Sequence, residues 1–159
     1  MKVLLDHYAE YDRWANTRFV ERLATEGDAV LDRPVPSSFP TLRATLLHIR
    51  NAEATWTARL QNATCPWPAE EERAIASLLK YTIALQDLVH GYDPNDLAQT
   101  VTYHDLRGNA HAQPRWQMLL HCFNHSTQHR GQLISMMRAL ELDAIPANDL
   151  VVFQRSLPR

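Results

Sequence analysis

The sequence has few of the residues that build disulfide-linked or turn-rich proteins. It contains only 2 cysteines and 4 glycines among 159 residues, against 9 prolines. Two cysteines, Cys65 and Cys122, do not make a disulfide framework, so we expect reduced thiols in a cytoplasmic protein. Few glycines and well-spaced prolines favour long helices with firm ends over a fold with many tight turns.

The chain also lacks a charge excess and a long apolar run. Its formal net charge of −2 gives no basic surface for nucleic acid or an anionic membrane. Lys2 and Asp6 stand where a signal peptide needs an apolar stretch, and no later run approaches membrane length. We therefore expect a small-molecule substrate or thiol as partner, no nucleic acid and no membrane. A single domain over residues 1–159 is expected from the length.

Hydrophobic periodicity predicts four helices. In four segments, apolar residues recur at steps of three and four positions with polar residues between them. These segments are Lys2–Thr25, Thr41–Asn62, Glu70–Tyr92 and Pro114–Leu142. The pattern predicts an all-α four-helix bundle with a long connection between the third and fourth helices.

The connections carry weaker signals. Residues 28–40 are rich in proline and serine and are expected to form a loop. The acidic run Glu70–Glu72 is expected to open the third helix, because negative charge is favoured at a helix N-terminus. Helical periodicity is lost over residues 93–113, where a short hairpin or extended loop is predicted. His104, Asp105 and His111 lie in this region, where a His–Asp pair could be catalytic or these could be exposed polar residues.

The fourth predicted helix places two histidines on a stripe that would otherwise be apolar. At about 100° per residue, His125 and His129 share a face with Cys122 and Leu133. Histidines at i and i+4 can bind one metal ion, because both side chains leave the same face. A buried histidine can equally be a hydrogen-bonded core residue, so the pair alone does not define a metal site. His48, on the second helix, allows the same two interpretations.

Three segments resemble the DinB-like (damage-inducible) family of four-helix-bundle proteins. They are Tyr11–Asn16, Thr45–Ile49 and Asn124–Gln132. In the last segment, asparagine precedes the first histidine and Arg-Gly-Gln follows the second, as in the family signature. The resemblance covers nearly the whole chain. It implies that one histidine of the second helix and two of the fourth bind a divalent metal, and the matching positions are His48, His125 and His129.

Three neutral imidazoles suit Zn²⁺ or Ni²⁺ best and also accept Fe²⁺ or Cu²⁺, and they leave a coordination position open. With no anionic ligand, such a site keeps its 2+ charge and can activate water or hold a thiolate. The zinc-protease motif is excluded, since Ser126 stands where that motif needs glutamate. Glu53 and Asp105 are candidate general bases, but spacing selects neither, so no catalytic residue is assigned.

Three neighbours of the histidines on the fourth helix could assist the site. His121 points about 80° away from His129, which favours a flanking role over ligation. Cys122 could be a thiolate ligand or a small buried hydrophobic residue. Gln132 could orient water or a histidine ring, or it could make an ordinary hydrogen bond between helices.

The resemblance implies a metal-dependent enzyme of the thiol S-transferase or hydrolase type. Characterised relatives include thiol-dependent S-transferases and a thiol-dependent isomerase, so the expected substrate is a small electrophile and a low-molecular-weight thiol is a candidate cofactor. The alternatives are a non-catalytic stress-response protein with a structural metal, and a bundle whose histidines belong to the core. Dimerisation is common among relatives, so a homodimer is a further expectation.

Overall fold

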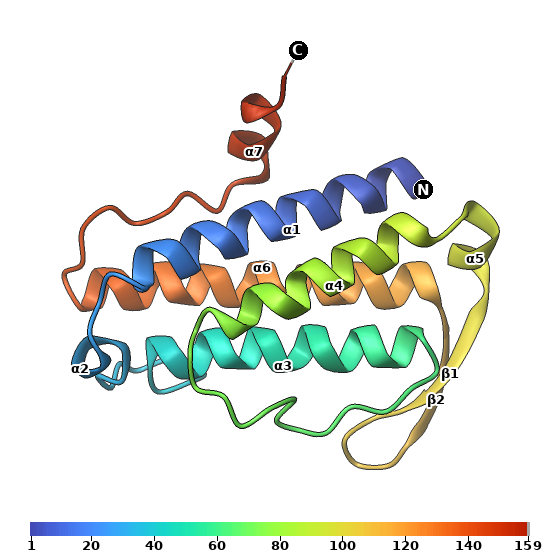
Figure 1. The fold of residues 1–159 in the computed structure, drawn as a ribbon, viewed down its shortest axis with the longest axis horizontal. Coiled ribbons are helices and arrows are strands. Elements are labelled where there is room, and N and C mark those ends of the chain that lie inside the picture. Colours follow the sequence, from blue (N-terminus) through green and yellow to red (C-terminus); the bar gives the residue numbers. More distant parts are fainter. Residues whose placement is uncertain (159) are drawn as a thin grey trace.

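Four long helices lie side by side in the computed structural model, which describes residues 1–158 (Figure 1). They are α1 (Lys2–Leu23), α3 (Leu42–Leu60), α4 (Ser77–Gly91) and α6 (Arg115–Ala139). Helix α1 packs against α4 and α6, and α3 packs against the same two helices. The predicted all-α four-helix bundle is therefore confirmed.

Three short helices and a hairpin complete the described part of the chain. The short helices are α2 (Asp28–Leu31), α5 (Pro94–Ala98) and α7 (Leu150–Ser156). Strand β1 (Thr100–His104) pairs antiparallel with β2 (Ala110–Pro114), so the predicted hairpin is present in the long connection between α4 and α6. Helix α7 lies outside the bundle, on the α1 side (Figure 1). No helix within residues 1–158 combines the length and apolar character needed to cross a membrane.

The third long helix begins later than the sequence predicted. Glu70–Glu72 does not open it, because α4 starts at Ser77. The buried Arg50 side chain of α3 donates to the backbone carbonyl groups of Glu70 and Glu72. These carbonyls would otherwise accept the first hydrogen bonds of a helix. The acidic run is thus held as an irregular segment across α3.

Short helices also interrupt segments that were expected to be irregular. Residues 28–40 include α2 instead of forming a loop throughout. Helix α5 begins with a capping box, in which Asp93 accepts from the backbone N–H of Asp96 and Asp96 accepts from that of Asp93. Helix α7 is anchored by Phe153, whose ring packs against Tyr11 and Trp14 of α1. Its single buried residue explains why periodicity did not reveal it.

The bundle contains two main hydrophobic clusters, one towards each end. One gathers around Phe19, Leu46, Ile49, Leu78 and Leu133. The other gathers around Leu5, Leu60, Leu85, Met118 and Phe123. Each draws on all four long helices, and burying such side chains stabilises the fold by about 1.5–3 kcal/mol per residue.

A layer of buried polar side chains separates the two clusters. It comprises Asp12, Asn16, Glu53, Thr82, Ser126 and Arg130. Arg130 donates to the Asp12 carboxylate at 2.5 Å and to Asn16 Oδ1 at 2.8 Å. Asn16 Nδ2 in turn donates to Glu53 Oε1 at 2.8 Å. Because every long helix contributes to it, the layer fixes the axial alignment of the helices.

Candidate metal centre

The two helices α3 and α6 bring three histidine side chains to one point. Nε2 of His48 lies 3.0 Å from Nε2 of His125, and Nε2 of His129 lies 3.1 Å from the same atom. One ligand atom from each residue lies within 4.8 Å of the other two. The structure therefore brings together the three histidines that the family resemblance implied as metal ligands.

This spacing fits a divalent metal ion. In a tetrahedral site with metal–nitrogen bonds of about 2.0–2.1 Å, neighbouring nitrogens lie about 3.3 Å apart. The Nε2 atoms of His48 and His129 each approach this separation from Nε2 of His125, and the ligand atoms of all three residues lie within 4.8 Å of one another. A proton between two ring nitrogens can account for only one of the two short Nε2–Nε2 contacts. A single cation between the rings accounts for both, because it accepts a lone pair from each of the three rings. The histidines could thus hold a metal, and no carboxylate or thiolate joins their cluster within residues 1–158.

Gln132 prepares His129 for this role. Its Oε1 lies 2.7 Å from His129 Nδ1, and its Nε2 donates to Ser38 Oγ at 2.8 Å. An amide oxygen only accepts, so Nδ1 carries the proton. In the neutral ring, Nε2 then presents its lone pair to the other two histidines. Of the roles left open for Gln132, contact with a histidine ring is the one that the structure forms.

Burial keeps two of the rings neutral. It lowers the pKa of His48 to about 4, with a smaller contribution from the neighbouring His129. It lowers the pKa of His125 to about 3, with smaller contributions from His129, His48 and His121. Neutral imidazole is the form that binds metal, so these two side chains are ready to coordinate at neutral pH.

Two aromatic side chains from loops border the histidines. Phe39 stacks on His48 with a centroid separation of 4.1 Å and meets His129 edge-on at 5.5 Å. Trp67 meets His48 edge-on at 5.7 Å and is 43% exposed. Sequence reasoning missed both residues. The only available signal was the presence of aromatic residues in the proline-rich segments that follow α2 and α3.

His121 and Cys122, which flank the histidines on α6, both lie outside the three-histidine cluster but in different surroundings. The ring of His121 lies 6.0 Å from that of His125 and 4.9 Å from that of Trp56, outside the three-histidine cluster. Cys122 is fully buried within the cluster around Phe123. Burial raises the pKa of its thiol well above the usual value, with smaller contributions from nearby carboxylates. Cys122 thus packs as a small hydrophobic residue.

Neither candidate general base lies at the histidines. Glu53 is enclosed in the polar layer, where Asn16, Thr82 and Ser126 surround its carboxyl group. Asp105 lies in the hairpin, where its carboxylate contacts His111 at 3.1 Å. Of the two histidines near it in the sequence, Asp105 contacts His111, because the turn directs this carboxylate to His111 and to Asn109.

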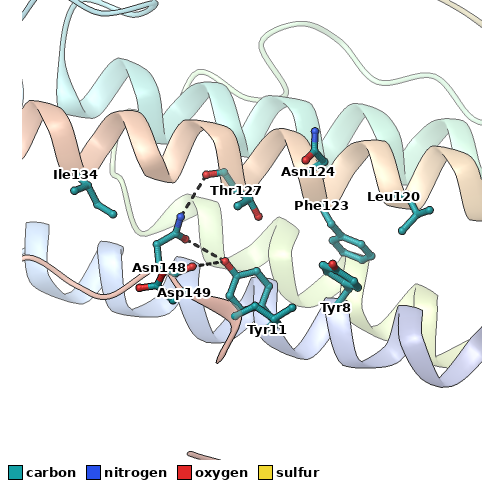
Figure 2. Close-up of a pocket in the computed structure, with 10 residues that line it drawn as sticks. Tyr8, Tyr11, Leu120, Phe123, Asn124, Thr127, Ile134, Asn148 and Asp149 are labelled. Atoms are coloured by element: carbon teal, nitrogen blue, oxygen red, sulfur yellow. Dashed lines mark hydrogen bonds between the residues drawn. The ribbon is translucent and has the colours of Figure 1, made fainter. Parts of the chain in front are cut away.

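A cavity of about 590 Å³ lies on the opposite side of α6 (Figure 2). Tyr8, Phe123 and Thr127 line it, with Asn148 crossing from the segment before α7. Asn148 accepts from Tyr11 Oη at 2.6 Å through its backbone carbonyl. On α6, Phe123 and Thr127 each point about 160° away from His125, so the cavity is separate from the candidate metal centre.

Four-helix bundles build metal sites in their core from side chains on facing helices. The three histidines of α3 and α6 have this arrangement, which is that of a metal-binding bundle. The profile of the DinB family matches residues 1–150. The chain belongs to the DinB family, as the sequence motifs indicated.

Solved structures with the same fold include three proteins from Bacillus species. A DinB-like protein of Bacillus subtilis, YjoA, is 13% identical, with a TM-score of 0.70 over 92% of this chain and 97% of its own. YfiT of Bacillus subtilis, described as a probable metal-dependent hydrolase with an unusual four-helix bundle topology, is 14% identical. Its TM-score is 0.68 over 90% of this chain and 91% of its own.

The third is a DinB-like protein of Bacillus cereus. It is 18% identical, with a TM-score of 0.61 over 84% of this chain and 89% of its own. At these identities the likeness concerns the fold alone. No curated protein sequence matches the chain.

Proposed function

We propose that the chain is a metal-dependent enzyme that acts on a small electrophilic substrate at His48, His125 and His129, with hydrolysis as the reaction. The convergence of the three Nε2 atoms carries the proposal. Membership of the DinB family and the fold shared with a probable metal-dependent hydrolase support it. Zn²⁺ and Ni²⁺ are the ions that we propose among those that imidazole ligands accept, which also include Fe²⁺ and Cu²⁺.

When bound, such an ion supplies Lewis acidity and lowers the pKa of a coordinated water. The residues of the chain supply the remaining requirements. Gln132 orients His129, and Phe39 shields one side of the site from bulk solvent. His48 and His125 are only partly buried, which leaves access for a substrate. In ester hydrolysis, water adds its hydroxyl group to the acyl carbon and its second proton to the departing oxygen.

A neutral ligand set also favours a second reaction of the same site, transfer of a low-molecular-weight thiol to an electrophile. A centre that keeps its full 2+ charge can bind a thiolate without repulsion from an anionic ligand. In that reaction the thiolate sulfur forms a bond to the electrophilic carbon, the leaving group departs with the bonding electron pair, and the thiol proton is released to solvent.

Protein purified without a histidine tag tests the proposal. We expect one equivalent of metal by elemental analysis, and no metal in His125→Ala. Turnover of 4-nitrophenyl esters, or of a thiol with 1-chloro-2,4-dinitrobenzene, should be lost on chelation and restored by zinc or nickel. Metal binding without turnover in either assay would instead support a non-catalytic metal-binding protein. A protein without metal would leave the histidines as core residues.

A further inference from the structure

A second pocket, of about 320 Å³, lies next to the C-terminal end of α3. The α3–α4 connection and the hairpin close its other sides. Its lining includes Thr55 and Arg59 from α3, Cys65 from the connection, and Tyr103 and Asp105 from the hairpin. None of the three histidines lines this pocket.

Arg59 places a cation without an ion-pair partner at this pocket. Its guanidinium carbon lies 4.7 Å from the ring centroid of Trp56 and 4.9 Å from that of Tyr103. Its Nη2 donates to the backbone carbonyl of His104 at 2.9 Å. Within residues 1–158 no carboxylate lies close enough to pair with it, and the remaining guanidinium N–H groups make no hydrogen bond. The aromatic rings therefore hold the guanidinium in place while several of its N–H groups remain free to donate.

Asp105 also lines the pocket but is committed to the hairpin turn. Its Oδ1 accepts from the backbone N–H groups of Arg107 and Asn109. Its Oδ2 contacts the Asn109 amide and His111. The carboxylate is therefore held in the turn by four partners and makes no direct ion pair with Arg59, although its charge still acts on the guanidinium through space.

Thr55 adds a second polar group. Its side chain lines the pocket and the residue is only 7% exposed; Oγ1 faces the Cys65 thiol, which hydrogen-bonds only weakly, and has no other hydrogen-bond partner within residues 1–158. Buried hydroxyl groups are normally satisfied, and an unsatisfied one costs about 1–3 kcal/mol. A ligand atom that accepts from both Thr55 and Arg59 would remove this cost.

The pocket is aligned with the candidate metal centre along α3. Thr55 and Arg59 follow His48 by seven and eleven positions, so each lies within about 20° of His48 around the helix, on either side of it. Seven residues correspond to a rise of about 10.5 Å. The guanidinium of Arg59 reaches back over Trp56, one turn nearer to His48. The centres of the two sites are therefore separated by roughly 11 Å.

The same two walls border both sites. The α3–α4 connection contributes Cys65 to the pocket, and two residues later its Trp67 contacts His48. On the other side, the ring of Trp56, which carries Arg59, contacts His121, and His121 contacts His125. One elongated molecule between these walls could reach from Arg59 to the three histidines.

We propose that the pocket is a recognition subsite for a carboxylate carried by the substrate of the metal centre. The inference rests on the proposed metal-dependent activity. Arg59 pairs with the carboxylate through its free N–H groups, and the Thr55 hydroxyl donates to it. The substrate class is then an elongated molecule with a carboxylate roughly 11 Å from the bond that reacts.

A matched pair of esters tests the subsite in the zinc-loaded protein. The mono-4-nitrophenyl ester of suberic acid carries a distal carboxylate, and its methyl-capped diester is the neutral equivalent of the same length. We expect kcat/KM for the acid to exceed that for the neutral ester at least tenfold. Arg59→Met should remove this preference by lowering kcat/KM for the acid ester, because Met retains packing on Trp56 but has no N–H group to pair with the carboxylate.

The control variant is Arg107→Met, which removes the same charge from an exposed position in the hairpin. It should keep the preference for the acid ester, which separates local recognition from general electrostatic attraction. Equal kcat/KM for the two esters in the unmodified protein would overturn the proposal. So would a preference that survives in Arg59→Met.

A binding measurement separates failure of the subsite from failure of the proposed function. Octanoate and neutral octanamide are titrated into the ¹⁵N-labelled, zinc-loaded protein while amide resonances near Thr55 and Tyr103 are followed. We expect octanoate to bind at least tenfold tighter than octanamide, and Arg59→Met to abolish the difference. Arg59-dependent binding without turnover of either ester would reject only the hydrolytic function. Equal binding of the two ligands would reject the subsite.

Discussion

Gln132 links the candidate metal centre to the loop that covers it. It accepts from His129 Nδ1 and donates to Ser38, one residue before the Phe39 ring that stacks on His48. Gln132→Met removes both contacts at similar volume. We expect zinc affinity to fall about 10- to 100-fold, because His129 loses the partner that fixes its tautomer and ring orientation. Competition with a chromophoric chelator measures the change.

The control for this variant is Gln128→Met, at an exposed position one turn earlier on α6. Its zinc affinity should match that of the unmodified protein. An unchanged affinity in Gln132→Met would show that the three rings are held in register by packing alone, with no contribution from the hydrogen bond.

Glu53 should make stability depend on pH. Burial raises the pKa of its carboxyl group well above the ordinary value of 4.5, and the nearby Asp12 charge adds to the rise. Folding therefore favours the protonated acid. Its stabilising contribution is complete below pH 4.5 and declines above it, by at most about 1.4 kcal/mol per pH unit, until the pKa of the folded state is reached.

Glu53→Gln mimics the protonated acid, since an amide N–H group can donate to Thr82 Oγ1, whose hydroxyl, which donates to Glu53 in the structure, can turn to the Leu78 carbonyl. We expect the variant to gain stability relative to the unmodified protein as pH rises from 4.5 to 8 in urea unfolding. Glu71→Gln, at an exposed position, should follow the unmodified protein. A Glu53→Gln difference that stays constant with pH would mean that the carboxylate is ionised in the fold.

The three histidines were predictable from sequence for a local reason. Two lie one turn apart on the apolar face of one helix, and the third belongs to a family motif on a helix that the bundle must place opposite. Phe39, Trp67 and Arg59 were not predictable in this way. The two aromatic residues come from irregular segments, whose path depends on tertiary contacts, and Arg59 acquires its significance only from the hairpin that closes over it.

At the scale of elements, the four long helices were predictable because each buries a stripe of recurring apolar residues. The start of α4 was not. The acidic run Glu70–Glu72 favours a helix N-terminus locally. Buried Arg50, however, donates hydrogen bonds to two of its backbone carbonyl groups, which are then not available to begin a helix. A contact between residues twenty positions apart overrides the local preference, and no periodicity in the sequence records it.

Arg50→Met should therefore release the α3–α4 connection. Arg50 is only 1% exposed and also donates to Ser77 Oγ at 3.0 Å, at the start of α4. Loss of its bonds to backbone carbonyls should lower the free energy of unfolding by about 2–4 kcal/mol. Hydrogen exchange should accelerate in residues 69–77 while the amides of α6 remain protected. Arg33→Met, at an exposed position, is the control.

At the scale of the whole molecule, the polar layer determines how the four helices align. Each helix has apolar residues on both sides of its polar contribution, so axial displacement of one helix would bury Asp12, Glu53 or Arg130 against hydrocarbon. Periodicity alone assigns these polar residues to the edges of helix faces. Their burial becomes apparent only when residues from four helices meet, because each needs partners that lie elsewhere in the sequence.

The same arrangement predicts the effect of metal on folding. An ion held by His48, His125 and His129 would join only α3 and α6, whereas both hydrophobic clusters and the polar layer are complete without it. We expect the apoprotein to remain folded with cooperative urea unfolding. Zinc should add about 4 kcal/mol at a free concentration 1,000 times Kd, and none in His125→Ala. An apoprotein without a cooperative transition would contradict this prediction and support a structural metal, because the ion would then be needed to hold the bundle together.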